Sequence, residues 1–162
     1  MVTQGQQAIL DALVAEFTKI NEQANDGPVI DLSAFRARFS IDMQKRNEEI
    51  MRKRVILQTI TEMAKADFAR LEKDFIGTGI KVNYLCDERA GTAPYLTITD
   101  KCGGQLKHLS YSVGGGDGKF YREIYVSHGT SIRCLTLAEL MEHRSISDAI
   151  YSMYSWNQRN SL

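Results

Sequence analysis

The stretch IGTGIKVNYLC, residues 76–86, separates two kinds of apolar pattern in this sequence. Before it, apolar residues recur at the three- and four-residue steps of an amphipathic helix. From Ile80 onward they alternate with polar residues, which is the period of a strand with one buried face. Gly77 and Gly79 lie between the two patterns and are typical of a helix end. Helices followed by strands and then further helix predict an α+β fold.

Two helical segments are predicted before these glycines. The first covers residues 6–24 and ends in a turn at residues 25–28. The second begins at Asp31 or Ser33, both good N-caps, and extends to Ile76. Because no glycine or proline interrupts it, a single helix of about 65 Å is possible at 1.5 Å per residue. That length exceeds what so small a domain needs, so a break at Ser40-Ile41-Asp42 is the alternative.

A seven-residue series of apolar residues runs through the second helical segment. Its members are Met43, Ile50, Leu57, Ala64 and Leu71. In the first half of the segment the partner positions Asn47 and Arg54 are polar, whereas a strict coiled coil needs both seams apolar. We therefore expect the second half to face the core. The first half carries a narrow stripe, with Met43 and Ile50, that another chain could cover.

Four strands are predicted within residues 80–126, because alternation recurs there between short, turn-rich linkers. Short linkers favour antiparallel neighbours, so the strands should form a meander. Residues 136–156 return to a helical pattern that starts with a capping box, and Arg144-Ser145 divides it if there are two helices. Residues 6–76 are thus helical and, with the sheet and the C-terminal helix or helix pair, form one domain over residues 1–162.

Composition limits the classes of function. The chain has 162 residues, with 20 Lys+Arg balanced by 20 Asp+Glu, so no overall charge attracts it to nucleic acid or to an anionic membrane. No apolar run approaches the roughly 20 residues of a membrane helix, and no secretory signal pattern is present. The three cysteines have neither disulfide-framework nor zinc-site spacing. We therefore expect a cytoplasmic protein without a membrane partner.

The stretch SVGGGDGKF, residues 112–120, looks at first like a phosphate-binding loop. A P-loop, however, needs glycine where Val113 stands and Ser or Thr where Phe120 stands. Both phosphate-binding glycine motifs also lead into a helix, whereas a strand pattern follows here. The stretch therefore predicts a hairpin loop between two strands.

No catalytic, metal or cofactor residues are predicted. Cys102 follows a lysine and has His108 and His128 nearby in sequence, so a thiolate nucleophile is the enzymatic alternative. Nothing in the sequence places either histidine against the thiol, and its reactivity stays open. The three histidines, which include His143, show no metal-site spacing.

Two segments could contact nucleic acid. Residues 36–54 have seven basic against three acidic residues, and Arg46, Arg52, Lys53 and Arg54 are the candidate phosphate contacts. Residues 136–156 contain a degenerate helix-turn-helix pattern, in which Met141 stands where a small residue is needed and Arg144 where an apolar one is usual. A nucleic-acid-binding accessory or regulatory protein is therefore the alternative function.

The leading prediction is a non-enzymatic protein–protein interaction or adaptor protein that acts as a homo-oligomer. Tyr95, Tyr121 and Tyr125 are expected on the sheet face opposite the core, where tyrosines suit contact with a partner. With Met43 and Ile50 of the long helical segment, they make up the predicted partner-binding residues. The sequence does not identify the partner.

Overall fold

The computed structural model describes residues 1–24, 29–87 and 89–161, and the predicted turn at residues 25–28 lies outside them. Contacts between residues group the chain into two compact units, Met1–Val55 and Ile56–Leu162. The single domain predicted over residues 1–162 stays a prediction. None of the described helices has the length and apolarity that crossing a membrane requires.

The first unit is a helical hairpin of α1 (Gln4–Gln23) and the first part of α2 (Leu32–Asp74). Thr3 caps α1, and the Asp31 carboxylate accepts the backbone N–H of Ser33 and Ala34 at 3.0 Å, as predicted for the start of α2. The alternative of a break at residues 40–42 is wrong, since α2 continues through them. No residue there removes a backbone donor or favours a non-helical φ.

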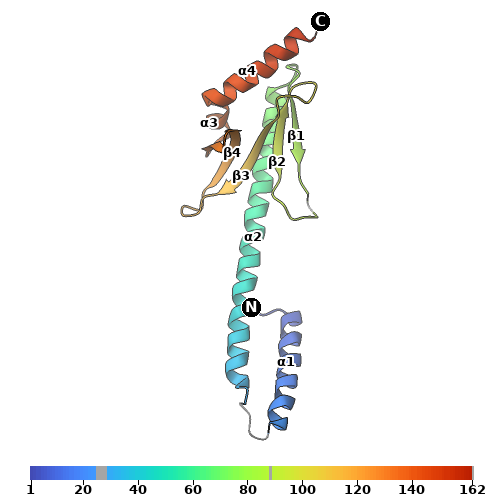
Figure 1. Cartoon of the computed structure of the whole chain (residues 1–162), viewed down its shortest axis with the longest axis vertical. Coiled ribbons are helices and arrows are strands. Elements are labelled where there is room, and N and C mark those ends of the chain that lie inside the picture. Colours follow the sequence, from blue (N-terminus) through green and yellow to red (C-terminus); the bar gives the residue numbers. More distant parts are fainter. Residues whose placement is uncertain (25–28, 88, 162) are drawn as a thin grey trace. The chain divides into compact units, whose positions relative to one another are not determined.

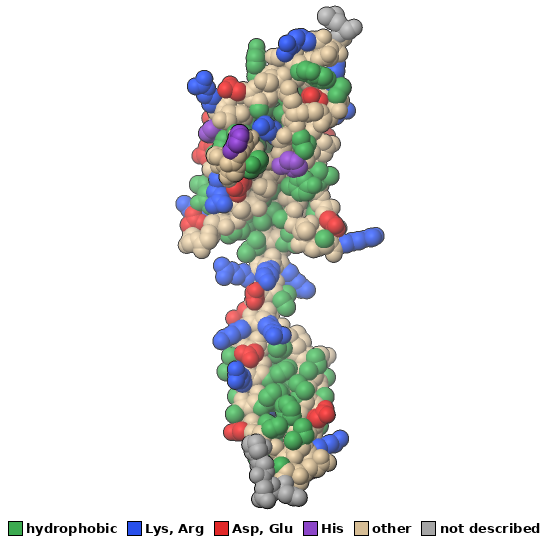
Figure 2. All heavy atoms as spheres, in the orientation of Figure 1, with side chains coloured by type: hydrophobic (Ala, Val, Ile, Leu, Met, Phe, Trp, Pro, Cys, Tyr) green, Lys and Arg blue, Asp and Glu red, His purple; other side chains and the backbone are tan. Residues whose placement is uncertain are grey.

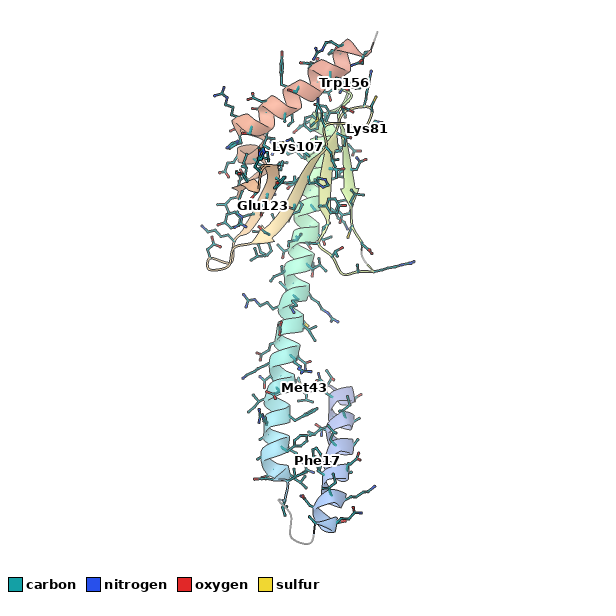
Figure 3. All side chains as sticks on the ribbon, in the orientation of Figure 1. Phe17, Met43, Lys81, Lys107, Glu123 and Trp156 are labelled. Atoms are coloured by element: carbon teal, nitrogen blue, oxygen red, sulfur yellow. The ribbon has the colours of Figure 1, made fainter. Side chains whose placement is uncertain are left out.

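The side chains of the hairpin fix how α1 lies along α2. The amide groups of Gln6 and Asn47 exchange two hydrogen bonds of 2.9 Å near the start of α1. Toward its end, the rings of Phe17 and Phe35 meet edge to face, with centroids 4.9 Å apart. Figure 3 shows Phe17 and Met43 in the space between the two helices. The two helices are therefore antiparallel with a defined register.

The second unit contains the rest of α2, a five-stranded antiparallel sheet and two C-terminal helices (Figure 1). The sheet is a meander with strand order β1-β2-β3-β4-β5, as expected for strands joined by short linkers. Its strands are β1 (Lys81–Leu85), β2 (Tyr95–Thr99), β3 (Lys107–Val113), β4 (Phe120–Ser127) and β5 (Thr130–Cys134). The predicted four strands are confirmed, and β5 is an addition.

Strand β5 follows β4 through a turn of only His128 and Gly129, which both have positive φ, 51° and 79°. Two positive φ values in a two-residue loop match the twist of the strands that it joins. Only Ile132 and Cys134 alternate on one side of β5, so its pattern was too short to reveal a strand. The glycine after His128 was the available signal.

The core lies on one face of the sheet. Leu96, Leu109 and Ile124 pair directly across β2, β3 and β4 and are fully buried. The helices α2, α3 (Leu137–Glu142) and α4 (Arg144–Arg159) cover this face. Their buried apolar residues are Ile60, Ala64, Leu71, Leu137, Leu140, Ile146 and Met153. The second half of α2 thus faces the core as predicted, and the C-terminal segment is a helix pair.

A buried ion pair joins α2 to the sheet within this core. The Asp67 carboxylate accepts hydrogen bonds from Arg122 Nε at 2.5 Å and Nη2 at 2.9 Å, and from the Tyr111 hydroxyl at 3.1 Å. A third guanidinium nitrogen donates to the carbonyl of Leu135 at 2.6 Å. Arg122 therefore belongs to the core face of β4, between apolar residues.

The glycine-rich stretch forms the predicted hairpin loop. Strand β3 ends at Val113, and the N–H of Gly114 donates to the carbonyl of Lys119 at 2.8 Å. The Asp117 side chain folds back over the loop, so a Cβ at Gly114 would lie 2.0 Å from its Oδ1. Gly118 has a positive φ of 64°. Sterics and backbone conformation therefore account for these two glycines.

Candidate interaction surfaces

The helical hairpin exposes much of its apolar surface. Within its described residues, Leu10 and Val14 are the only buried hydrophobic side chains. A second set of apolar residues on α1 lies next to Leu10 and Val14. It consists of Ile9, Leu13 and Ile20, whose steps of four and seven residues place them on one side of the helix. Ile9 is 57% exposed. Figure 2 shows hydrophobic side chains gathered in one broad patch on the visible side of this unit.

The helix α2 extends this apolar surface. Phe35 and Phe39 are partly exposed, and their ring centroids are 6.2 Å apart. Because Phe35 also contacts Phe17, the surface continues from one helix to the other. We call this surface the hairpin face, and it consists of Ile9, Leu13, Phe17, Ile20, Phe35 and Phe39.

The two predicted partner-binding residues on α2 differ in exposure. Met43 is partly buried on the α1 side of the helix, four residues before Asn47. Ile50 is 48% exposed and, with Met51, lines a hollow of about 500 Å³ at the start of the chain. Met43 thus contributes to packing within the hairpin, whereas Ile50 stays exposed to solvent.

The predicted basic contacts do not share one side of α2. Arg52, Lys53 and Arg54 are consecutive, so a helix directs them about 100° apart. Lys53 also pairs with Glu49 at 2.8 Å, and Arg46 lies seven residues before Lys53, away from the Arg52 side. The structure therefore distributes these four cations around the helix.

A different basic set does share a line. Arg38, Lys45 and Arg52 follow each other at seven-residue steps along α2. In the part of the chain that the structure describes, none of them forms an ion pair. Sequence reasoning grouped basic residues by proximity and missed this set, although the seven-residue step was the signal that reveals it.

The three predicted tyrosines lie on the sheet face opposite the core, which we call the open face. No helix covers this face among the described residues (Figure 1). Tyr95 is 38% exposed, and its ring centroid lies 5.7 Å from that of His108. Tyr125 is 57% exposed, and its hydroxyl accepts the backbone N–H of Gly129 at 2.8 Å. Both tyrosines are therefore exposed to solvent on the open face.

Tyr121 and Glu123 of β4 make the middle of the open face polar. The Tyr121 hydroxyl donates to Asp117, and the Arg133 guanidinium lies 5.4 Å from the centre of its ring. A hydrogen bond from Ser131, with help from Arg133, lowers the pKa of the Glu123 carboxyl (Figure 3). Glu123 lies two residues from both Tyr121 and Tyr125, so the alternation of a strand could have placed it on the same sheet face from the sequence alone. Because these groups satisfy one another, the open face is less apolar than the hairpin face.

A further groove of about 440 Å³ lies in the second unit, where the end of α2 meets α3 and α4. Its lining is mostly apolar, and it includes Tyr151 and Tyr154, which are 70% and 40% exposed.

The enzymatic alternative gains no supporting geometry. Cys102 is exposed in the turn before β3, where its backbone N–H donates to the buried Asp100 carboxylate at 2.9 Å. His108 lies against Tyr95, and His128 is in the β4–β5 turn. Neither imidazole forms a hydrogen bond with the thiol in the described chain. Across the same residues, no group of three His, Cys, Asp or Glu side chains is placed to hold a metal ion.

The C-terminal segment differs from a helix-turn-helix unit. Its two helices, α3 and α4, are separated by His143 alone, whereas that motif has a turn of about three to four residues. Arg144, at the start of α4, is exposed and lies 3.7 Å from Asp148. The buried apolar residues of α3 and α4 instead pack in the core of the second unit.

Comparisons with models of protein families, with curated proteins and with solved structures found no match to this chain.

Proposed function

We propose that this chain is a non-enzymatic protein–protein interaction protein that acts as a homo-oligomer through its helical hairpin. The observation that carries the proposal is the hairpin face. Two helices cannot enclose a core, because each has only one neighbour to pack against. Leu10 and Val14 are accordingly the only hydrophobic residues buried in the described part of Met1–Val55.

The energy available from covering the hairpin face supports association. Complete burial of one large apolar side chain is worth about 1.5–3 kcal/mol. Ile9 and Ile20 are 57% and 48% exposed, and the other four members of the face are partly exposed. Covering them recovers several kcal/mol from each of the two copies, and the sum exceeds the lower end of the roughly 4–15 kcal/mol cost of association.

Sedimentation velocity of the full chain over a concentration series tests this proposal. The wild type should sediment as an oligomer at micromolar concentration, and Ile9→Lys/Ile20→Lys should weaken association by at least about tenfold, because two charges enter an apolar contact. Ile76→Lys is the matched control, since Ile76 is 77% exposed in the second unit. A wild type that stays monomeric at every concentration would rule out the proposed self-association.

The open face is a separate candidate surface for a different protein partner. Tyr95 and Tyr125 supply exposed aromatic area, which suits recognition because tyrosine loses little conformational entropy on binding. Tyr95→Ser/Tyr125→Ser should leave self-association unchanged in the same sedimentation experiment. A loss of the oligomer in this variant would place self-association on the sheet instead.

Nucleic-acid binding is the second candidate function, and the line of Arg38, Lys45 and Arg52 favours it. Three cations at about 10.5 Å steps along a helix can each contact phosphate. The protein should then shift random duplex DNA in a salt-sensitive manner. Unchanged binding after replacement of Arg46, Arg52, Lys53 and Arg54 by Gln would exclude the version that relies on the clustered cations.

A further inference from the structure

The helices of the hairpin carry opposite net charges. Helix α1 (Gln4–Gln23) has three acidic residues and one basic, a net charge of −2. The stretch of α2 that pairs with it, Leu32–Val55, has seven basic and three acidic residues, a net charge of +4. A copy that docks on the hairpin face is therefore attracted or repelled according to which helix it brings beside which.

Two symmetric arrangements bring the hairpin faces of two copies together. With the two-fold axis parallel to the helices, α1 of each copy lies beside α2 of the other. With the axis perpendicular to the helices and parallel to the faces, α1 lies beside α1 and α2 beside α2. The second arrangement places two helices of charge +4 together, whereas the first gives every helix neighbours of opposite charge.

We propose that the occupant of the hairpin face is a second copy of this chain, which forms a four-helix bundle with α1 of each copy beside α2 of the other. This inference rests on the proposed function and specifies the partner and its orientation. In the bundle, Ile9, Leu13 and Ile20 of one copy pack against Phe35 and Phe39 of the other. The apolar face is covered, and the charges alternate around the bundle.

The register of the hairpin identifies a charge pair across this interface. Gln6 bonds to Asn47, and ten residues onward on α1 and ten backward on α2 lead to Glu16 and Ala37, so Glu16 is level with Arg38. With the axis parallel to the helices, α1 of the second copy stands at the same level. Glu16 of each copy then lies near Arg38 of the other.

Both charged residues are placed at the border of the hairpin face. Glu16 lies seven residues after Ile9, and Arg38 lies three residues after Phe35, so each is on the same side of its helix as that apolar residue. Among the described residues neither of them has an ion-pair partner within the chain. Both are therefore available to the second copy.

Charge exchange in the full chain tests the arrangement, with light scattering and sedimentation as readouts. The wild type should have twice the 18.3 kDa chain mass. Glu16→Arg and Arg38→Glu should each weaken the dimer by about tenfold, because two symmetric contacts become repulsive. The double variant, or an equimolar mixture of the two single variants, should return to within about threefold of wild type.

Controls separate the possible outcomes. Glu22→Arg changes the charge of α1 equally but lies off the line of Ile9 and Glu16, so it should stay within about threefold of wild type. Circular dichroism should show the same helix content in every variant. A monomeric wild type would overturn the proposed self-association together with the bundle. An oligomeric wild type without rescue by the double variant would overturn this arrangement alone.

Discussion

Asp67 and Arg122 show how much single residues decide in this protein. They lie on α2 and β4, with side chains only 6% and 15% exposed, and they form a bidentate ion pair. Separate burial of either charge would be strongly unfavourable, so each residue requires the other. The pair fixes the position of α2 on the sheet.

Asp67→Ala should lower the free energy of unfolding by about 3–5 kcal/mol, because Arg122 is left buried without its counter-charge. Asp74→Ala is the matched control on the same helix, since Asp74 and Arg70 form an exposed pair at 3.7 Å. The control should cost less than about 1 kcal/mol. Urea unfolding of the full chain measures both, and equal losses would contradict this account of Asp67.

The hydroxyl of Tyr111 should make the free energy of unfolding depend on pH. Burial, with the neighbouring Asp67 carboxylate, raises the pKa of its hydroxyl well above the ordinary value of 10.0. Above that pH the unfolded chain loses this proton while the folded chain keeps it. The contribution of Tyr111 to stability should therefore be intact below pH 10 and decline above it, by about 1.4 kcal/mol per pH unit.

Tyr111→Phe isolates this effect. Below pH 10 it should be less stable than wild type by about 1 kcal/mol, because the hydrogen bond to Asp67 is lost. The difference should shrink between pH 10 and 11, since phenylalanine does not titrate. A difference in urea stability that is constant from pH 8 to 11 would show that the hydroxyl is not protected in this way.

At the scale of elements, the turn between β4 and β5 determines whether the sheet has a fifth strand. Gly129 has a φ of 79°, which an L-residue adopts only at a cost of about 1–2 kcal/mol. Gly129→Ala should therefore lower the free energy of unfolding by about 1 kcal/mol. Gly115→Ala is the control, because its φ lies outside the left-handed range and nothing lies within 4 Å of the added Cβ. Equal thermal midpoints for the two variants would contradict this account of the turn.

For the long helix α2, the sequence pattern predicted where the helix ends but not which basic residues share one side. The absence of glycine and proline made one continuous helix possible, but a break at residues 40–42 stayed open until the structure showed α2 running through them. The end of α2 before β1 did follow from Gly77 and Gly79, whose φ values are 76° and 77°. The candidate basic site was less predictable. Nearness in sequence suggested residues 52–54 as one contact, but the helix directs consecutive residues to different sides.

At the scale of the whole molecule, the two units differ in how they satisfy their apolar residues. The second unit covers a continuous core in which Leu96, Leu109 and Ile124 are fully buried. The first unit leaves the hairpin face uncovered within its described residues. Stability of the first unit should therefore depend on association, whereas stability of the second should not.

Hydrogen exchange at two protein concentrations measures this difference. Amides of α1 and of Leu32–Val55 should exchange more slowly at high concentration, because association removes the open state of the hairpin. Amides of β2–β4 should exchange at the same rate at both concentrations. Protection of the hairpin that is independent of concentration would contradict its role as the contact between copies.

The sequence by itself determined the order of the two N-terminal helices and of four of the five strands, the meander, and the return to helix after the sheet. These features depend on local periodicity, capping and glycine conformation, which neighbouring residues decide among themselves. It also placed Tyr95, Tyr121 and Tyr125 on one side of the sheet, because alternation along a strand is local.

Only the tertiary structure decided which distant residues meet. Asp67 and Arg122 are 55 residues apart, and no local pattern records their pairing. The hairpin face likewise became identifiable only from the Gln6–Asn47 contact, which shows which side of α1 faces α2. Helix α1 has apolar residues on two sides, and its sequence alone does not tell which of them is packed against α2. Burial and long-range contact depend on how elements pack together, and that packing separates the closed core of the second unit from the open face of the hairpin.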